Sequence, residues 1–293
     1  MRAPALPSLM SASSAAARGG PAALKQASGI IELRDYTIRP SEFKCFLNLS
    51  EEFSSARASV YKGFLGMFTA DTGGNVSRVV HLYYFEDYHA RDAARKAAAA
   101  DAQWQRYTDA ARTCLLAKES TILLQSPEAM AAAGVACASD FRPPVNDPNK
   151  DLQVVYELRK YQLHPGGGGV KKALSAFQHG YSGMGVLHGT AAARTGPPLA
   201  VVDVEQLHAR LPSLPAKLAA DGVGQLALVA YSDVGLMNQV FEIYRYPSAE
   251  HMIQACTRTR TAAAWQESKA TVYSLCRDFS ITLLHPASFS PWN

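Results

Sequence analysis

A short stretch that occurs twice constrains the fold of this chain more than any other feature. The residues Glu32–Tyr36 (Glu-Leu-Arg-Asp-Tyr) return 125 positions later as Glu157–Tyr161 (Glu-Leu-Arg-Lys-Tyr). A second pair, Trp104-Gln105 and Trp265-Gln266, is separated by 161 positions, so the second copy holds about 36 more residues than the first. Because self-similarity of this kind indicates repeated structural units, we expect two copies of one fold.

The order of elements in the first copy is strand, helix, strand, strand, helix, strand. Apolar residues at helical or alternating spacing predict these elements, and the Gly-rich loop 71–75 predicts a hairpin between the two middle strands. This order is that of the ferredoxin-like fold. The predicted elements are strand 30–38, a helix from Ser41 to Val60, strands 64–70 and 76–86, helices 88–100 and 104–118, and strand 120–124.

The predicted fold class is therefore α+β, with two ferredoxin-like domains. Each domain is expected to have a four-stranded antiparallel sheet with helices on one face. The 293 residues, 48% of them hydrophobic, provide ample material for such cores. The other sheet face must also be covered, so we expect the two sheets to pack on each other.

The expected domain organisation follows the repeat. Residues 30–128 form the first domain, 129–152 a linker rich in Ala and Pro, and 153–290 the second domain with its insertion at about 180–223. Long structured insertions act as lids or as docking surfaces, whereas a solvated loop with scattered leucines is the simpler alternative. The candidate docking residues are Leu207, Leu211, Leu214 and Leu218.

The first 29 residues have a composition of their own. They are rich in Ala and Ser, contain Arg2, Arg18 and Lys25, and have no acidic residue before Glu32. This composition is typical of an organellar transit peptide, and it favours the mitochondrion over the plastid. Without these three basic residues the formal charge of +4 nearly vanishes, so we do not expect a nucleic-acid partner.

Several other functional classes lack their sequence signals. The five cysteines are widely spaced, without a Cys-x-x-Cys motif, and predict neither a disulfide framework nor a metal site. The glycine run 166–169 lacks the spacing of a phosphate-binding P-loop and is interpreted as a flexible turn. No apolar stretch is long enough for a transmembrane span. We therefore expect no cofactor, no metal and no transmembrane segment.

The repeated motifs resemble those of the NIPSNAP family. The resemblance includes Glu-Leu-Arg-x-Tyr followed by proline, the strand 79–86, the Trp104-Gln105 pair and the closing strand 280–286. It implies a tandem of dimeric α/β-barrel domains and a mitochondrial location, in the matrix or at the inner membrane. It also implies mostly non-enzymatic roles in membrane association, protein traffic or recruitment of mitophagy adaptors.

Two polar rows are the candidate site residues. Strand alternation places Glu32, Arg34 and Tyr36 on one face, and Glu157, Arg159 and Tyr161 repeat this pattern. We expect these rows to form a polar seam between the two domains, because a buried acid and a guanidinium commonly satisfy one another. In the alternative, the rows line a ligand site, and His81 acts as a haem ligand or a base.

The sequence thus supports two hypotheses of different classes. The first is a non-enzymatic mitochondrial protein without catalytic residues, which assembles with other mitochondrial proteins in a large membrane-associated complex. The second is a small-molecule- or haem-binding barrel that resembles a monooxygenase. The sequence leaves open whether the chain is a monomer or a homo-oligomer.

Overall fold

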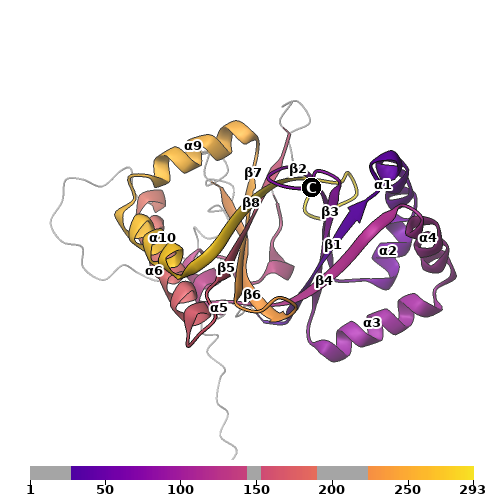
Figure 1. The fold of residues 1–293 in the computed structure, drawn as a ribbon, viewed down its shortest axis with the longest axis horizontal. Helices are drawn as coiled ribbons and strands as arrows, with labels where there is room; N and C mark the ends of the chain where they lie inside the picture. Colours follow the sequence, from indigo (N-terminus) through magenta and orange to yellow (C-terminus); the bar gives the residue numbers. More distant parts are fainter. Residues whose placement is uncertain (1–27, 144–152, 190–223) are drawn as a thin grey trace, which may run out of the picture.

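Eight antiparallel strands form one closed barrel in the computed structural model, which describes residues 28–143, 153–189 and 224–293 (Figure 1). Four strands come from each half of the chain. Those of the first half are β1 (Ile30–Ile38), β2 (Phe64–Thr72), β3 (Arg78–Phe85) and β4 (Leu115–Gln125). Those of the second half are β5 (Val155–Leu163), β6 (Gln225–Val234), β7 (Gln239–Tyr246) and β8 (Cys276–Pro286).

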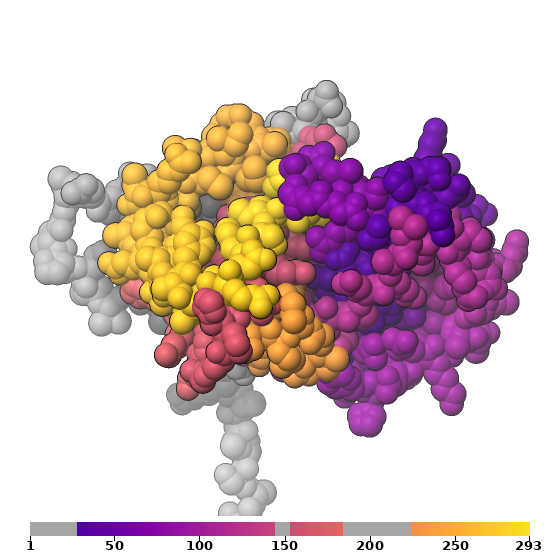
Figure 2. Space-filling model, in the orientation of Figure 1, coloured from indigo at the N-terminus to yellow at the C-terminus, as the bar shows by residue number. Residues whose placement is uncertain are grey.

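Helices cover the barrel on two opposite outer sides (Figure 1). Those of the first half are α1 (Phe43–Glu52), α2 (Ser54–Val60), α3 (Tyr88–Ala100) and α4 (Ala102–Arg112). Those that follow are α5 (Pro127–Ala132), α6 (Gly169–Gly189), α9 (Ala249–Thr259) and α10 (Ala263–Leu275). Figure 2 shows the two halves side by side, the first from indigo to magenta and the second mainly in orange and yellow.

Hydrogen bonds between strand edges join the two halves, which corrects the expected packing of one sheet on another. Strand β2 pairs with β8, and β4 pairs with β6, both antiparallel. The strand order is therefore β1-β3-β2-β8-β5-β7-β6-β4, with β4 returning to β1. The sheet faces without helices still point towards each other, but as the inner wall of a single barrel.

Apolar side chains and the C-terminal tail fill the barrel interior. Phe68 of β2 and Tyr156 of β5 have ring centroids 4.9 Å apart across the interior. Trp292 is only 1% exposed, stacks on Tyr156 and lies 5.1 Å from the ring of Phe141, which belongs to the segment between the two halves. The backbone of Trp292 donates a hydrogen bond to Leu65 O at 3.2 Å. The tail is thus part of the core.

Most element predictions are confirmed, and the differences have local causes. Strand 30–38 and helix 88–100 have their predicted bounds. Asp101 ends α3 and caps α4 by accepting a hydrogen bond from Trp104 N. The helix predicted over 104–118 ends at Arg112, because the chain turns at Cys114 into β4. The loop predicted at 71–75 lies at 73–77, because β2 continues to Thr72 and β3 begins at Arg78. It contains Gly73 at φ +92, where an added Cβ would lie 2.0 Å from Ile281 O.

Two further predicted boundaries are corrected. The helix expected from Ser41 to Val60 is interrupted at Phe53 and forms α1 and α2. Residues 180–189, which we assigned to the insertion, belong to α6. Within the described ranges no helix is long and apolar enough to cross a membrane. The leader 1–27 and residues 190–223, which include the candidate docking leucines, lie outside the described residues.

We predict that Trp292→Ala lowers the free energy of unfolding by about 3–5 kcal/mol, because it empties a fully buried aromatic site in the barrel. Urea unfolding followed by circular dichroism measures this loss. Leu236→Ala is the control, since Leu236 is 61% exposed and its truncation should change stability by less than about 0.5 kcal/mol. A loss below about 1 kcal/mol for Trp292→Ala would show that the tail does not belong to the core.

Candidate functional site

The polar rows lie beneath the helices of each half, and not in a seam between the halves. In β1, Ile31 and Leu33 face the barrel interior, whereas Glu32 and Arg34 face α3. Tyr36 belongs to a separate apolar cluster with residues of α1 and α4. Strand alternation grouped these residues correctly, but both faces of the strand are buried, so the pattern did not reveal which face the helices cover.

Glu32 is the centre of a buried ionic network that ties β1 to α3. Its carboxylate accepts hydrogen bonds from Arg34 Nε at 3.1 Å, from Arg91 Nε at 3.0 Å and from Ser120 Oγ at 2.9 Å. Arg95 lies 3.7 Å away. Burial alone would raise the pKa of Glu32, but the hydrogen bonds and charge of Arg34, with Arg91 and Ser120, outweigh it and lower the pKa to about 2. Glu32 is therefore ionised at neutral pH.

Arg57 of α2 is a buried cation with a different environment. It is 1% exposed and donates hydrogen bonds to Tyr83 Oη at 3.0 Å and to Tyr107 Oη at 2.8 Å. Its guanidinium lies 5.4 Å from the ring centroid of Trp104. Among the described residues no carboxylate lies within salt-bridge distance of Arg57, and its Nε has no hydrogen-bond acceptor. Its charge is stabilised by aromatic rings and hydroxyls alone.

A cavity of about 480 Å³ lies between the sheet and the helices of the first half. This volume is within the usual range for small-molecule sites. The aromatic groups that line it are Tyr36, Phe46, Tyr61, Tyr83, Trp104 and Tyr107. The charged groups that line it are Arg34, Arg57, Arg95, Arg112 and Lys118, with Glu32 and Glu119 as the acids. The cationic groups outnumber the acidic ones, so the cavity favours an anion.

His81 lies behind this cavity and does not line it. Its ring is 4.7 Å from that of Tyr36, and both ring nitrogens are buried without a hydrogen-bond partner. Burial, followed by the nearby charges of Arg57, Arg34 and Lys118, lowers the pKa of His81 well below its usual value. His81 is therefore neutral, and in this position it does not reach a ligand in the cavity.

The corresponding position of the second half carries an acid. His81 is the register partner of Arg34, and Glu242 is the register partner of Arg159. Glu242 is fully buried and accepts hydrogen bonds from Tyr244 Oη at 2.7 Å, from Tyr161 and from Tyr181 of α6. Burial, followed by the charge of Glu242, raises the pKa of Tyr161, Tyr181 and Tyr244. The two halves thus carry a neutral imidazole and a carboxylic acid at the same register position.

Close helix packing fills the equivalent space in the second half. Tyr181 of α6 stacks on Trp265 of α10 with ring centroids 5.6 Å apart. The two helices approach through glycines of α6: a Cβ on Gly183 would lie 2.4 Å from Ala264 Cβ, and one on Gly180 would lie 2.8 Å from Ser268 Cβ. Arg159 donates to Glu157 at 2.9 Å and also lies 3.8 Å from Glu242, and Tyr246 Oη donates to Glu157 at 2.9 Å. Among the described residues of the second half, helix packing therefore occupies the place that the cavity has in the first half.

Sequence reasoning missed Arg57, Tyr83 and Tyr107. They come from α2, β3 and α4, so no local motif contains them. The sequence does show that the two copies differ at one equivalent position, His81 in the first and Glu242 in the second. This difference indicates that the surroundings of the position differ between the copies, but it does not identify the three residues.

The family model of NIPSNAP matches residues 31–128 and 213–291, which is more than half of the chain. The chain belongs to the NIPSNAP family. Among curated relatives, human NipSnap homolog 3A is 29% identical over 173 residues and mouse NipSnap homolog 3B is 28% identical over 172 residues. Each alignment covers 56% of this NIPSNAP-family chain and 63% of the relative, so the matched region spans less than two thirds of these proteins.

Solved structures share the barrel at much lower identity. A putative monooxygenase from Lactobacillus acidophilus superimposes with a TM-score of 0.52 over 89% of this chain and 95% of that chain, at 9% identity. A putative monooxygenase from Fusobacterium nucleatum gives a TM-score of 0.51 over 89% and 94%, at 8% identity. These similarities establish the shared fold of this NIPSNAP-family chain and no further property.

We predict that the free energy of unfolding decreases as the pH is lowered, and that part of this decrease comes from protonation of Glu32. A depressed folded-state pKa stabilises the protein above the ordinary value of 4.5, and this contribution is lost as the pH falls towards 2. Between pH 5 and pH 3 the wild type should lose about 2 kcal/mol more unfolding free energy than Glu32→Gln.

Urea unfolding at each pH measures this difference. Glu119→Gln is the matched control, since Glu119 is an exposed carboxylate on the same side of the cavity and its variant should keep the wild-type pH dependence. Equal acid sensitivity of Glu32→Gln and the wild type would contradict the assigned network.

Proposed function

We propose that the first half of this NIPSNAP-family chain binds a small anionic molecule in the cavity between its sheet and helices. The observation that carries the proposal is the buried Arg57 guanidinium, which has no carboxylate partner in the described part of the chain and lines the cavity. A buried charge is costly unless it is paired. A ligand anion would supply the missing charge, and the interaction would be strengthened by the low local dielectric.

The lining of the cavity specifies the class of ligand. The guanidiniums of Arg34 and Arg57 are already placed against aromatic rings, so an anionic group between them would meet a fixed charge distribution. The remaining walls are flat aromatic surfaces, which favour a planar apolar body. We therefore propose an aromatic or similarly flat carboxylate as the ligand. We propose one molecule per chain, because in the described part of the second half α6 and α10 pack closely in the equivalent place.

This proposal retains the ligand-binding part of the monooxygenase-like alternative without its chemistry. The neutral, enclosed His81 does not line the cavity, so its position does not support a role as haem ligand or base for this site. The likeness to putative monooxygenases concerns the barrel alone. We assign binding to the site and no reaction.

We predict that the fluorescent anion 1-anilinonaphthalene-8-sulfonate binds the native protein with one site per chain, and that Arg57→Met weakens this binding about 10- to 100-fold. The reason is the loss of a charge-assisted hydrogen bond, worth about 1.5–3 kcal/mol. Fluorescence titration gives the affinity and stoichiometry. The uncharged analogue N-phenyl-1-naphthylamine should bind weakly to both proteins.

Two further variants control this experiment. Arg106→Met removes an exposed cation of α4 that does not line the cavity, and it should leave the affinity unchanged. Ala99→Trp adds a large side chain at an exposed position of the lining and should block binding without altering the buried core. Undiminished binding by both Arg57→Met and Ala99→Trp would overturn the proposed site.

We also propose that the protein is mitochondrial and associates with other mitochondrial proteins, in assembly, traffic or mitophagy. The basic, acid-free leader and the membership of the NIPSNAP family support this proposal. The insertion carries the candidate docking residues Leu207, Leu211, Leu214 and Leu218.

We predict that the protein from gently lysed mitochondria migrates with a larger complex on a native gel, and that deletion of 197–218 abolishes this migration. The double variant with Leu207→Ser and Leu211→Ser keeps the length of the insertion and tests the candidate docking residues alone. Unchanged migration of the deletion variant would remove the docking role from the insertion.

A further inference from the structure

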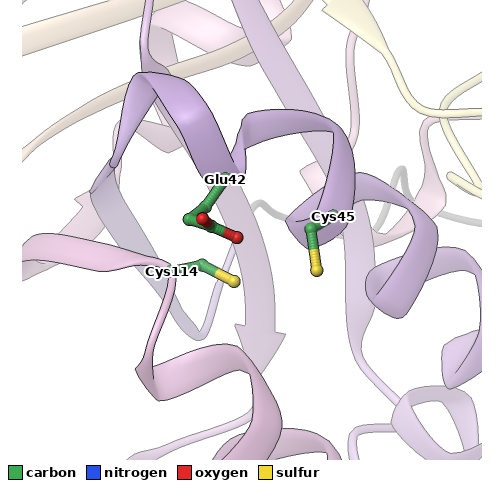
Figure 3. A group of neighbouring side chains, drawn as sticks. All are labelled: Glu42, Cys45 and Cys114. Atoms are coloured by element: carbon green, nitrogen blue, oxygen red, sulfur yellow. The ribbon is translucent and has the colours of Figure 1, made fainter.

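Three side chains with metal-binding groups meet at one edge of the first half. Glu42 ends the short 3-10 helix Pro40–Glu42, Cys45 lies in the first turn of α1, and Cys114 lies between α4 and β4. Figure 3 shows the three side chains directed towards a common space. Their ligand atoms, one carboxylate oxygen and two Sγ atoms, all lie within 4.8 Å of one another.

The three groups are available for a ligand. Cys45 and Cys114 are both free thiols, the first exposed and the second buried. The Glu42 carboxylate makes no hydrogen bond to cap α1 and forms no salt bridge with a described residue.

The backbone around the cluster is held in place by hydrogen bonds. Arg39 N donates to Cys114 O at 2.8 Å, and Arg39 Nε donates to Thr113 O at 3.2 Å. Cys114 N in turn donates to Ala111 O at 3.0 Å. These bonds fix the segment before Glu42 against the junction that carries Cys114. The ligands therefore come from two chain segments whose relative position is set without a metal.

The geometry points to a zinc site formed by Glu42, Cys45 and Cys114, a ligand set that no local sequence motif encodes. Two thiolates and one carboxylate suit Zn²⁺ in chemical type. Tetrahedral coordination with Zn–S of about 2.3 Å and Zn–O of about 2.0–2.2 Å requires ligand atoms about 3.4–3.8 Å apart. The ligand atoms, all within 4.8 Å of one another, would have to move closer by at most about 1.4 Å through rotation of the side chains. A fourth position is left for water, on the side of the exposed Cys45.

The zinc site would connect two walls of the cavity described above. Phe46, which follows Cys45, and Leu115, which follows Cys114, both line that cavity. A metal bound between Cys45 and Cys114 would thus tie α1 to the start of β4 and hold the wall that Phe46 forms. This inference concerns a different set of ligands and does not depend on the anion site.

The test is a Zn²⁺ titration of the reduced, metal-free full chain in competition with a chromophoric chelator. We expect one Zn²⁺ per chain, with an affinity that rises with pH because binding displaces the thiol protons. Cys45→Ser removes an exposed ligand without disturbing the core and should weaken binding at least about 100-fold, since loss of even an indirect partner of a zinc site costs 10- to 100-fold. Glu42→Gln should weaken it at least about 10-fold.

Cys256→Ser is the matched control, because Cys256 is a partly buried free thiol outside the cluster and its loss should leave the affinity unchanged. Replacement of Zn²⁺ by Co²⁺ should give a thiolate charge-transfer absorption that Cys45→Ser abolishes. Equal Zn²⁺ affinity of the wild type and Cys45→Ser would overturn the site. So would a reduced protein that binds no Zn²⁺ while oxidation links Cys45 to Cys114, which would identify the pair as a disulfide former.

Discussion

The need to hydrogen-bond every strand edge governs this structure. Within each half, two strands are left at the edge of a four-stranded sheet: β2 and β4 in the first, β8 and β6 in the second. Pairing β2 with β8 and β4 with β6 satisfies both sets of backbone groups and closes the sheet on itself. Closure directs the helix-free faces inwards and leaves the helices outside. Each half then retains an independent interface between sheet and helices, where the polar residues lie.

The interface between sheet and helices differs between the two copies in its buried polar residues and in its packing. In the second, Glu242 lies among tyrosine hydroxyls and 3.8 Å from Arg159, and glycines of α6 allow the helix to pack against α10. In the first, the helix is interrupted at Phe53, Arg57 enters from α2, and a neutral His81 occupies the position of the acid. Among the described residues, side chains of the second copy pack closely at this interface, whereas the first copy has a cavity lined mainly by cationic and aromatic groups. The pair of acid and arginine on the first strand is common to both copies. In the first copy its acid also binds Arg91 of α3, and in the second it binds Tyr246 of β7.

The sequence predicted the strands and the duplication well, because the repeat and the alternation of apolar residues are local features. Strand 30–38 and helix 88–100 needed no other information. The side of β1 on which Glu32 and Arg34 lie could not be predicted from alternation. Ile30 and Ile31 are on opposite faces of the strand and both are buried, so burial does not distinguish the two faces. The cavity depends on a helix break and on residues from α2, β3 and α4. The group of Glu42, Cys45 and Cys114 depends on a contact between segments about 70 residues apart in the chain, which spacing rules for metal motifs do not detect.

The covalent link between the two copies has a consequence for how such a barrel can diversify. A barrel assembled from two identical chains carries every residue twice, so a change that opens a pocket on one side opens it on the other, and the cost in packing is doubled. Here a single polypeptide supplies both sides. The second copy can keep its tyrosines and its closely packed α6 and α10 as the stable partner, while the first accepts an unneutralised guanidinium and an unfilled space. Fusion thus lets one side of the barrel specialise at the expense of its own stability, with the other side as its support.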